Sequence, residues 1–155
     1  MAMKAVDLDI RPDRVMLDTN VLLAATDGKR AGHQDATMVM NEWAVDGVTL
    51  CTSGQILREY LSVATRPADR NGLGLKMADA VGNVRAIRER AAYLAEDAKV
   101  TDHLQRLLTD VACGGKQVHD ANVVATMLAH GVSTVVTMNA ADFERFEQYV
   151  SLVSL

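Results

Sequence analysis

Long apolar runs, cysteines and aromatic side chains are all scarce in this sequence of 155 residues. No run approaches the about 18 consecutive apolar residues of a membrane span, and the opening MAMKAVDLDIRPDR carries acids where a signal peptide is apolar. Only two cysteines occur, Cys51 and Cys113, and they form no C-x-x-C pair, which favours buried reduced thiols over a disulfide or zinc site. With aromatics at 4%, no stacking surface for single-stranded bases is evident. We therefore expect a cytoplasmic protein with no membrane partner.

The composition predicts one globular domain. Hydrophobic residues make up 49% of the chain, and 155 residues can bury a sufficient core without a disulfide framework or a structural metal. We expect a single domain over 1–155, with its core at about 14–155. The net charge of −4 argues against nonspecific coating of nucleic acid. Residues 58–90 nevertheless carry seven basic against four acidic side chains, which is either an ordinary solvated helix face or a phosphate-binding surface.

Short apolar runs alternate with longer segments of helical period, which predicts an α/β/α sandwich with a mostly parallel central sheet. The expected strands are 14–18, 48–51, 134–138 and 150–153, while 91–96 is either a third strand or a helix end. The expected helices start near Val21 and at 33–46, 53–65 and 75–90, with Thr52 or Ser53 capping the third. Two more are expected, one capped by Thr101 and running to Leu108, and one over 119–130.

Four acidic residues lie where such sheets place chemistry. Asp18 ends the first strand, Asp120 opens the helix after Gly114-Gly115, and Asp142 follows the strand 134–138. Glu59 lies in the helix 53–65, at the border of an apolar stripe that turns Tyr60 inward. Each aspartate alone has a structural explanation as a helix cap, and Glu59 alone is typical of a solvated helix face. Ligands of open parallel sheets collect outside the carboxyl ends of the strands, so the joint placement favours a shared site.

A cluster of carboxylates requires a cation. Two of them about 4 Å apart repel by roughly 4 kcal/mol at an effective dielectric of 20. Hard oxygen ligands suit Mg²⁺ or Mn²⁺, and no His/Cys spacing here resembles a zinc site. Beside a phosphodiester, such ions activate water and stabilise the leaving oxygen. The reaction class indicated is metal-dependent phosphodiester hydrolysis.

Four blocks of the sequence resemble the PIN domain, specifically the VapC-type ribonuclease toxins. They are LDTNVLL (17–23), ILREYLSVATRP (56–67), VHDANVVATMLAHGV (118–132) and VVTMNAADFERF (135–146). Each block alone is a weak signal, but their order and spacing fit over nearly the full length of the chain.

The resemblance implies which residues form the site. The acidic quartet is Asp18, Glu59, Asp120 and Asp142, with Asp18 and Asp120 first among the metal ligands. Further side chains would support the site through hydrogen bonds to the carboxylates or to water on the metal: Thr19, Asn20, Thr137 and Asn139. This chain has Asn139 where many relatives have aspartate, so the fourth acid is either Asp142 or partly missing.

The resemblance also implies an Mg²⁺- or Mn²⁺-dependent endoribonuclease that acts as the toxin of a toxin–antitoxin pair. Its partners would be an RNA substrate, a cognate antitoxin and a second copy of the chain in a homodimer. Four arginines would contact RNA phosphates: Arg66, Arg70, Arg85 and Arg88. The histidines His103, His119 and His130 are expected to face solvent or backbone partners. The alternatives are a housekeeping RNA-processing nuclease, a noncatalytic RNA- or protein-binding module and, last, a phosphoacceptor domain without a suitably placed lysine.

Overall fold

Six short strands form one sheet in this computed structural model, which describes all of residues 1–155. Every hydrogen-bonded pair of strands is parallel, and the spatial order is β1-β6-β5-β2-β3-β4. The expected parallel sheet is confirmed, and the segment 91–96 contains a strand rather than a helix end. The strands are β1 (Met3–Lys4), β2 (Arg14–Leu17), β3 (Thr49–Ser53), β4 (Ala92–Leu94), β5 (Thr134–Thr137) and β6 (Ser151–Ser154).

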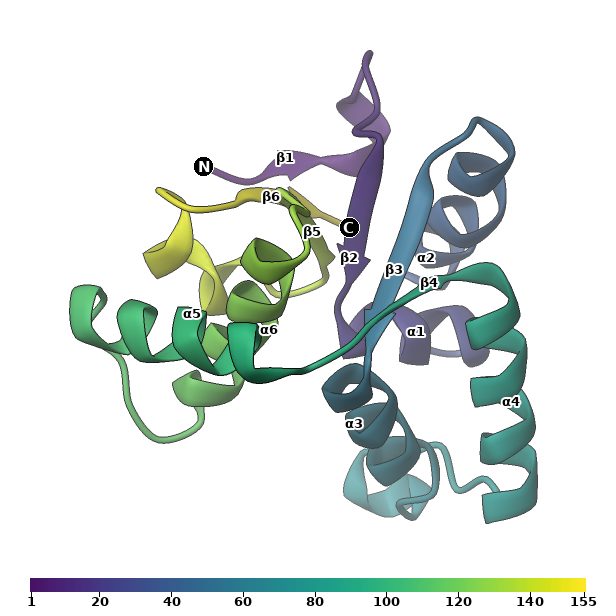
Figure 1. Ribbon diagram of the computed structural model, residues 1–155. Coiled ribbons are helices and arrows are strands. Elements are labelled where there is room, and N and C mark those ends of the chain that lie inside the picture. Colours follow the sequence, from purple (N-terminus) through teal and green to yellow (C-terminus); the bar gives the residue numbers. More distant parts are fainter.

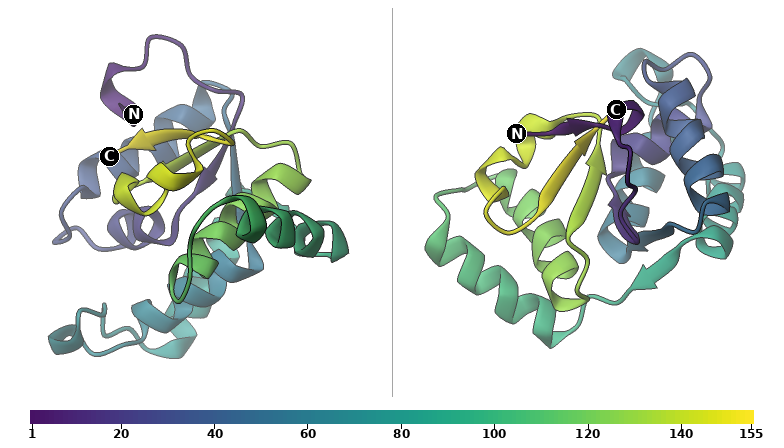
Figure 2. Two further views of the ribbon diagram at one scale, coloured as in Figure 1. Left: turned by 90° about the vertical axis from the view of Figure 1, so that its left-hand side faces the viewer. Right: turned by 90° about the horizontal axis from the view of Figure 1, so that it is seen from above.

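Helices cover both faces of the sheet and make the three layers of an α/β/α sandwich (Figures 1 and 2). On one side lie α1, α2 and α4, on the other α5 and α6, while α3 lies below the ends of β2 and β3 in Figure 1. The helix α2 continues directly into a π-helical segment, Val39–Trp43. The α-helices are α1 (Thr19–Thr26), α2 (His33–Met38), α3 (Gly54–Ala64), α4 (Met77–Arg90), α5 (Ala98–Asp110) and α6 (Gln117–Ala129).

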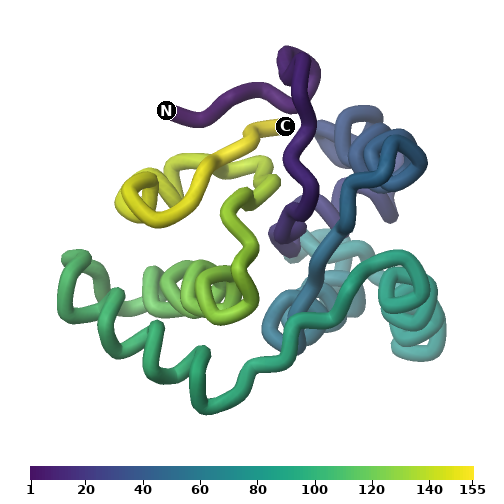
Figure 3. The backbone as a smooth tube through the Cα atoms, turned by 45° about the horizontal axis from the view of Figure 1, so that its top comes forward, coloured from purple at the N-terminus to yellow at the C-terminus, as the bar shows by residue number.

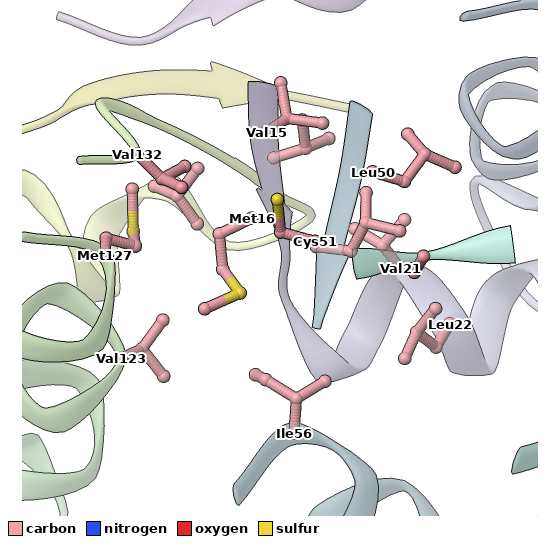
Figure 4. Close-up of a cluster of buried hydrophobic side chains, with 14 of the residues drawn as sticks. Val15, Met16, Val21, Leu22, Leu50, Cys51, Ile56, Val123, Met127 and Val132 are labelled. Atoms are coloured by element: carbon pink, nitrogen blue, oxygen red, sulfur yellow. The ribbon is translucent and has the colours of Figure 1, made fainter. Parts of the chain in front are cut away.

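The central strands are apolar because both of their faces are covered. Val15, Met16 and Leu17 of β2 are fully buried, which is why this strand reads as a continuous apolar run without alternation. Helices from both layers add their apolar faces, so that 39 buried hydrophobic residues form a single cluster. Figure 4 shows part of it, with Met16 and Val123 on one side and Val21 and Leu22 on the other.

Helix caps confirm one expectation and correct another. Ser53 caps α3, because its hydroxyl accepts a hydrogen bond from the Ile56 amide over 3.4 Å. The prediction that Thr101 caps the next helix is wrong. The helix α5 begins at Ala98, and the Asp97 carboxylate accepts hydrogen bonds from the amides of Lys99 and Val100. Thr101 therefore lies inside the helix, one turn after the true cap.

The first residues of the chain belong to the sheet, although the core was expected to start at about residue 14. The strand β1 pairs with β6, with Met3 opposite Val153, so the first and last segments lie side by side (Figure 3). Ala5, just after β1, is buried. Cys51 is buried and Cys113 partly buried, and both are free thiols, as expected. None of the helices combines the length and the apolar character needed to cross a bilayer.

The strand order reverses at β2. From β2 the chain moves outward to β3 and β4, then returns to the other side of β2 through β5 and β6. The connections that follow β2 and precede β5 therefore lie on opposite faces of the sheet. In open α/β sheets, ligands bind outside the carboxyl ends of the strands at such a reversal. Here those ends are Leu17 of β2 and Thr137 of β5.

Candidate active site

Asp18 stands at the carboxyl end of β2 and is the N-cap of α1. Its Oδ1 accepts a hydrogen bond from the Thr19 amide over 2.8 Å, and its Oδ2 accepts one from the Thr137 hydroxyl over 2.7 Å. Burial raises the pKa of Asp18 to about 6, the two hydrogen bonds oppose this, and the charges of Glu59 and Asp142 add to the rise. Asp18 is thus both a helix cap and a member of an acidic cluster. The structural and the functional interpretation of this residue are therefore compatible.

Glu59 approaches Asp18 from the second turn of α3. One carboxylate oxygen, Oε2, accepts a hydrogen bond from the Thr19 hydroxyl over 2.8 Å. The other, Oε1, accepts one from the side-chain amide of Gln55, also over 2.8 Å. Tyr60, the next residue, is fully buried, so Glu59 lies at the border of the apolar face as predicted. Both of its oxygens are held in place by neighbouring side chains.

Asp120 lies in the first turn of α6 but does not open it. The helix begins at Gln117, so the prediction that Asp120 opens the helix is wrong by one turn. At this position the carboxylate does not cap the start of the helix. His119 is exposed, as expected, and it is the carbonyl group of this residue that enters the site, where it accepts a hydrogen bond from Gln55 over 2.9 Å.

The charges of the other three carboxylates affect the pKa of Asp120. Burial raises its pKa to about 6, and the charges of Asp142, Asp18 and Glu59 raise it further in that order. His119 acts in the opposite direction, and no hydrogen bond to the carboxylate offsets the rise. Four carboxylates that lie far apart in the sequence therefore come near enough at the carboxyl end of the sheet for their charges to interact.

The segment after β5 carries the fourth acid. Asp142 is exposed and lies in a short 3₁₀ turn, Ala140–Asp142. The side-chain amide of Asn139 donates to Asp142 Oδ2 over 2.8 Å, and the Asn139 backbone amide donates to the Thr137 hydroxyl over 3.0 Å. At the position where the family resemblance leads us to expect aspartate, this chain thus has an amide that orients Asp142.

Asn20 fastens the end of β5 to the start of α1 and makes no contact with a carboxylate. Its side-chain amide donates to the Thr137 hydroxyl over 3.3 Å, and its Oδ1 accepts a hydrogen bond from the Met138 amide over 3.1 Å. Of the four expected supporting residues, Thr19, Thr137 and Asn139 contact the acids directly. Asn20 acts one step away, because it holds Thr137 in place.

A tight turn packs against the same segment. Gly32 lies between α1 and α2 in the left-handed region, with φ +78°, where a side chain is strained. A Cβ atom at this position would also collide with the terminal methyl group of Met138. A substitution here would therefore strain the backbone and also require the flexible end of Met138 to move aside.

The donor set suits a hard divalent cation. The side chains that contact the carboxylates are threonine hydroxyls and the N–H groups of amides, so the ligand atoms available to a cation are carboxylate and hydroxyl oxygens. No three acidic, histidine or cysteine side chains lie close enough to form a direct cage for a metal ion. Mg²⁺ does not require one, because it is commonly bound by one or two carboxylates and keeps several waters. Asp18 and Asp120 fit that role, because burial, and to a lesser degree the neighbouring carboxylates, raises the pKa of both groups and disfavours an uncompensated charge there.

The four arginines expected to bind RNA are exposed, and neither of the two ion pairs in the structure involves them. Arg66 and Arg70 follow α3, while Arg85 and Arg88 lie on α4. Arg88 lies over the ring of Tyr93, 5.1 Å from the ring centroid, and Tyr93 is 47% exposed. An arginine and an aromatic ring therefore share a surface at the edge strand β4.

Sequence reasoning missed three polar residues beside the cluster. Asn122 of α6 donates from its side-chain amide to Gln55 Oε1 over 2.6 Å and to Glu96 Oε1 over 2.8 Å. The second oxygen of Glu96 accepts a hydrogen bond from the Gln55 backbone amide over 2.7 Å. The residues lie 26 to 67 positions apart, so no local pattern relates them. The only available signal is a glutamine in the first turn of an otherwise apolar helix start.

Known structures share this architecture. VapBC2 from Rickettsia felis, crystallised with a promoter DNA fragment, superposes with a TM-score of 0.66 at 18% identity, over 92% of this chain and 98% of that chain. A DNA-bound VapBC from Salmonella typhimurium gives 0.66 at 19% identity, over 90% and 96%. VapC20 from Mycobacterium tuberculosis, described as a toxin that cleaves the sarcin-ricin loop, gives 0.61 at 20% identity, over 86% and 94%. No curated protein matches the sequence at a significant level.

The sequence itself assigns the family. Residues 15–148 match the family described as "PIN domain", a span that runs from β2 to the segment before β6 and contains all four carboxylates. Together with the parallel sheet and the acids at its carboxyl end, this match shows that the chain belongs to the PIN-domain family.

Proposed function

We propose that this protein is a metal-dependent endoribonuclease that acts as the toxin of a toxin–antitoxin pair. The observation that carries the proposal is the convergence of Asp18, Glu59, Asp120 and Asp142 at the reversal of the strand order, with the pKa of both Asp18 and Asp120 raised to about 6. A purely structural role does not account for two acidic groups whose charge is disfavoured by burial and, to a lesser degree, by the neighbouring carboxylates. Such groups favour a site that binds a cation beside a phosphodiester.

The residues divide the work by position. Asp18 and Asp120 would hold Mg²⁺ or Mn²⁺, which when bound supplies charge neutralisation at the phosphate and a lowered pKa for water. Thr137 and Thr19 keep the Asp18 carboxylate in one orientation through their hydrogen bonds. Glu59, held by Thr19 and Gln55, completes the negative charge of the site. Asp142 is exposed and oriented by Asn139, so it is placed to take a proton from a water that attacks the phosphorus in line.

Partners follow from the same proposal. VapBC complexes are among the similar structures, which supports a cognate antitoxin, and a homodimer is the assembly we expect. The RNA would run over α3 and α4, where Arg66, Arg70, Arg85 and Arg88 are exposed and free to contact phosphates. We place the protein in the cytoplasm, where free thiols such as Cys51 stay reduced.

The test is cleavage of total cellular RNA by the purified protein. Wild type and Asp18→Asn are compared with Mg²⁺, with Mn²⁺ and with chelator. Discrete fragments that require metal and vanish in the variant would support the nuclease. Absence of cleavage by folded, antitoxin-free protein under both metals would overturn it and favour a noncatalytic binding module. A small neighbouring reading frame whose product blocks cleavage separates a toxin from a housekeeping nuclease.

A further inference from the structure

The side chain of Gln55 lies at the junction of three elements beside the acidic cluster. It belongs to the first turn of α3, is 5% exposed, and reaches both Glu59 on its own helix and the His119 carbonyl on α6. His119 directly precedes Asp120. One amide group therefore connects the helix that carries Glu59 to the residue before Asp120.

The orientation of this amide is fixed. Asn122 donates a hydrogen bond to Gln55 Oε1, so the Gln55 nitrogen must face Glu59 and His119, where both of its hydrogens are used. Asn122 is in turn oriented by Glu96, which also binds the Gln55 backbone amide. If the Gln55 amide turned over, its oxygen would face the Glu59 carboxylate and two acceptors would meet. The network thus allows one arrangement.

From this geometry we propose that Gln55 is a positioning residue that sets the place of Glu59 relative to Asp18 and Asp120, with Asn122 as the group that orients it. Glu59 is held between two donors, Gln55 on one oxygen and Thr19 on the other, and Thr19 follows Asp18. Gln55 thereby connects Glu59 to the residue before Asp120, and Thr19 connects Glu59 to Asp18. This inference rests on the proposed function, because it assigns a residue that tunes the same metal site.

The experiment compares Gln55→Met with Asn83→Leu. Methionine keeps the length and volume of glutamine but donates no hydrogen bond. Asn83 is the matched control, because its side-chain amide donates to the Tyr60 hydroxyl over 3.0 Å and so supports the opposite face of the same helix. The dissociation constant for Mn²⁺ alone is measured by electron paramagnetic resonance without RNA, and the Mn²⁺ concentration for half-maximal cleavage is measured in parallel.

We expect Gln55→Met to weaken Mn²⁺ binding about 10-fold, in the range found when groups that orient metal ligands are removed, and to shift the half-maximal concentration equally. Cleavage should return at saturating Mn²⁺, and Asn83→Leu should leave both values unchanged. Equal Mn²⁺ affinity in wild type and Gln55→Met, or an equal loss in the control, would overturn the proposal.

A second variant covers a failure of Gln55→Met to fold. Asn122→Leu leaves Gln55 in place but frees its amide to turn, so we expect a several-fold weaker Mn²⁺ affinity, and an unchanged affinity would contradict the proposed role. If the wild type binds Mn²⁺ but cuts no RNA, the proposed function fails while the dissociation constants still decide on Gln55. A wild type that binds no Mn²⁺ would overturn both.

Discussion

The hydroxyl group of Thr137 donates a hydrogen bond of 2.7 Å to Asp18 Oδ2 and joins residues that lie 119 positions apart. The hydroxyl oxygen of Thr137 itself accepts hydrogen bonds from the Asn139 backbone amide and the Asn20 side chain. The pairing of β2 with β5 brings the two residues together, since Leu17 and Val136 are register partners. The position of β5 in the sheet therefore affects the pKa of Asp18 through the Thr137 hydroxyl.

Replacement of Thr137 by valine removes that donor at nearly constant volume. Because the hydrogen bond lowers the pKa of Asp18, its loss should raise this pKa further and move the acid limb of the cleavage pH profile to higher pH. The free energy of unfolding should fall by about 1–2 kcal/mol, since a hydrogen bond to a buried carboxylate is lost. Thr134→Val, on the same strand, is the control. An acid limb that stays in place in Thr137→Val would contradict the coupling.

Asp120→Asn should make the protein more stable at neutral pH while abolishing cleavage. The pKa of Asp120 rises from 3.8 to about 6 on folding, so the folded state binds more protons than the unfolded state between these values. Stability therefore falls as the pH rises from about 4 to 6 and stays low above it. Asp120→Asn has no carboxylate to lose its proton, so its free energy of unfolding at pH 8 should exceed that of the wild type by on the order of 1 kcal/mol. This figure allows for solvent screening of a half-buried group.

Urea unfolding of wild type and Asp120→Asn in chelator, at pH 5 and pH 8, checks this expectation. The difference between the two proteins should be larger at pH 8, where the wild-type carboxylate is charged. A variant that is less stable than wild type at pH 8 would show that Asp120 serves the fold rather than the site.

Tyr60→Phe should lower the stability of the fold without changing the metal dependence of cleavage. The Tyr60 hydroxyl lies 2.9 Å from the Thr26 hydroxyl and accepts a hydrogen bond from Asn83, and it makes no hydrogen bond to the acidic residues. Loss of this hydroxyl should lower the free energy of unfolding by about 1–2 kcal/mol, because its partners are left without it. The Mn²⁺ dependence of cleavage should not change. Thermal unfolding and a metal titration measure the two effects, and a shifted titration would refute the separation.

Charge reversal at Arg85 and Arg88 tests the RNA surface. In an Asp18→Asn background, which blocks cleavage, we expect weaker RNA binding at low salt. The slope of log affinity against log salt should fall by roughly one for each lost phosphate contact. Fluorescence anisotropy with labelled RNA gives both quantities. Arg106→Glu on α5, across the sheet, is the control, and equal slopes in all variants would exclude these arginines from the interface.

The sequence predicts the sheet and the acids better than the details of the helix ends. The strand 14–18 is recognisable because burial on both faces demands an apolar run, here Val15–Leu17. Helix starts depend on which side chain reaches a free amide, so Asp97 and not Thr101 caps α5. The strand β1 was missed because two exposed residues carry no pattern. Gln55 was missed because its partners come from other elements, and only folding brings them together.

The closely packed turn at Gly32 has a consequence for how this protein can vary. Any side chain there meets an unfavourable backbone conformation, and its Cβ atom also requires the flexible end of the Met138 side chain to move aside. The amide of Met138 is bound by Asn20, which also holds Thr137, so the disturbance would pass toward Asp18. If the protein is the toxin that we propose, substitutions at Gly32 should therefore be enriched among surviving cells in a mutational scan of cells that express it, even though this residue is only partly buried.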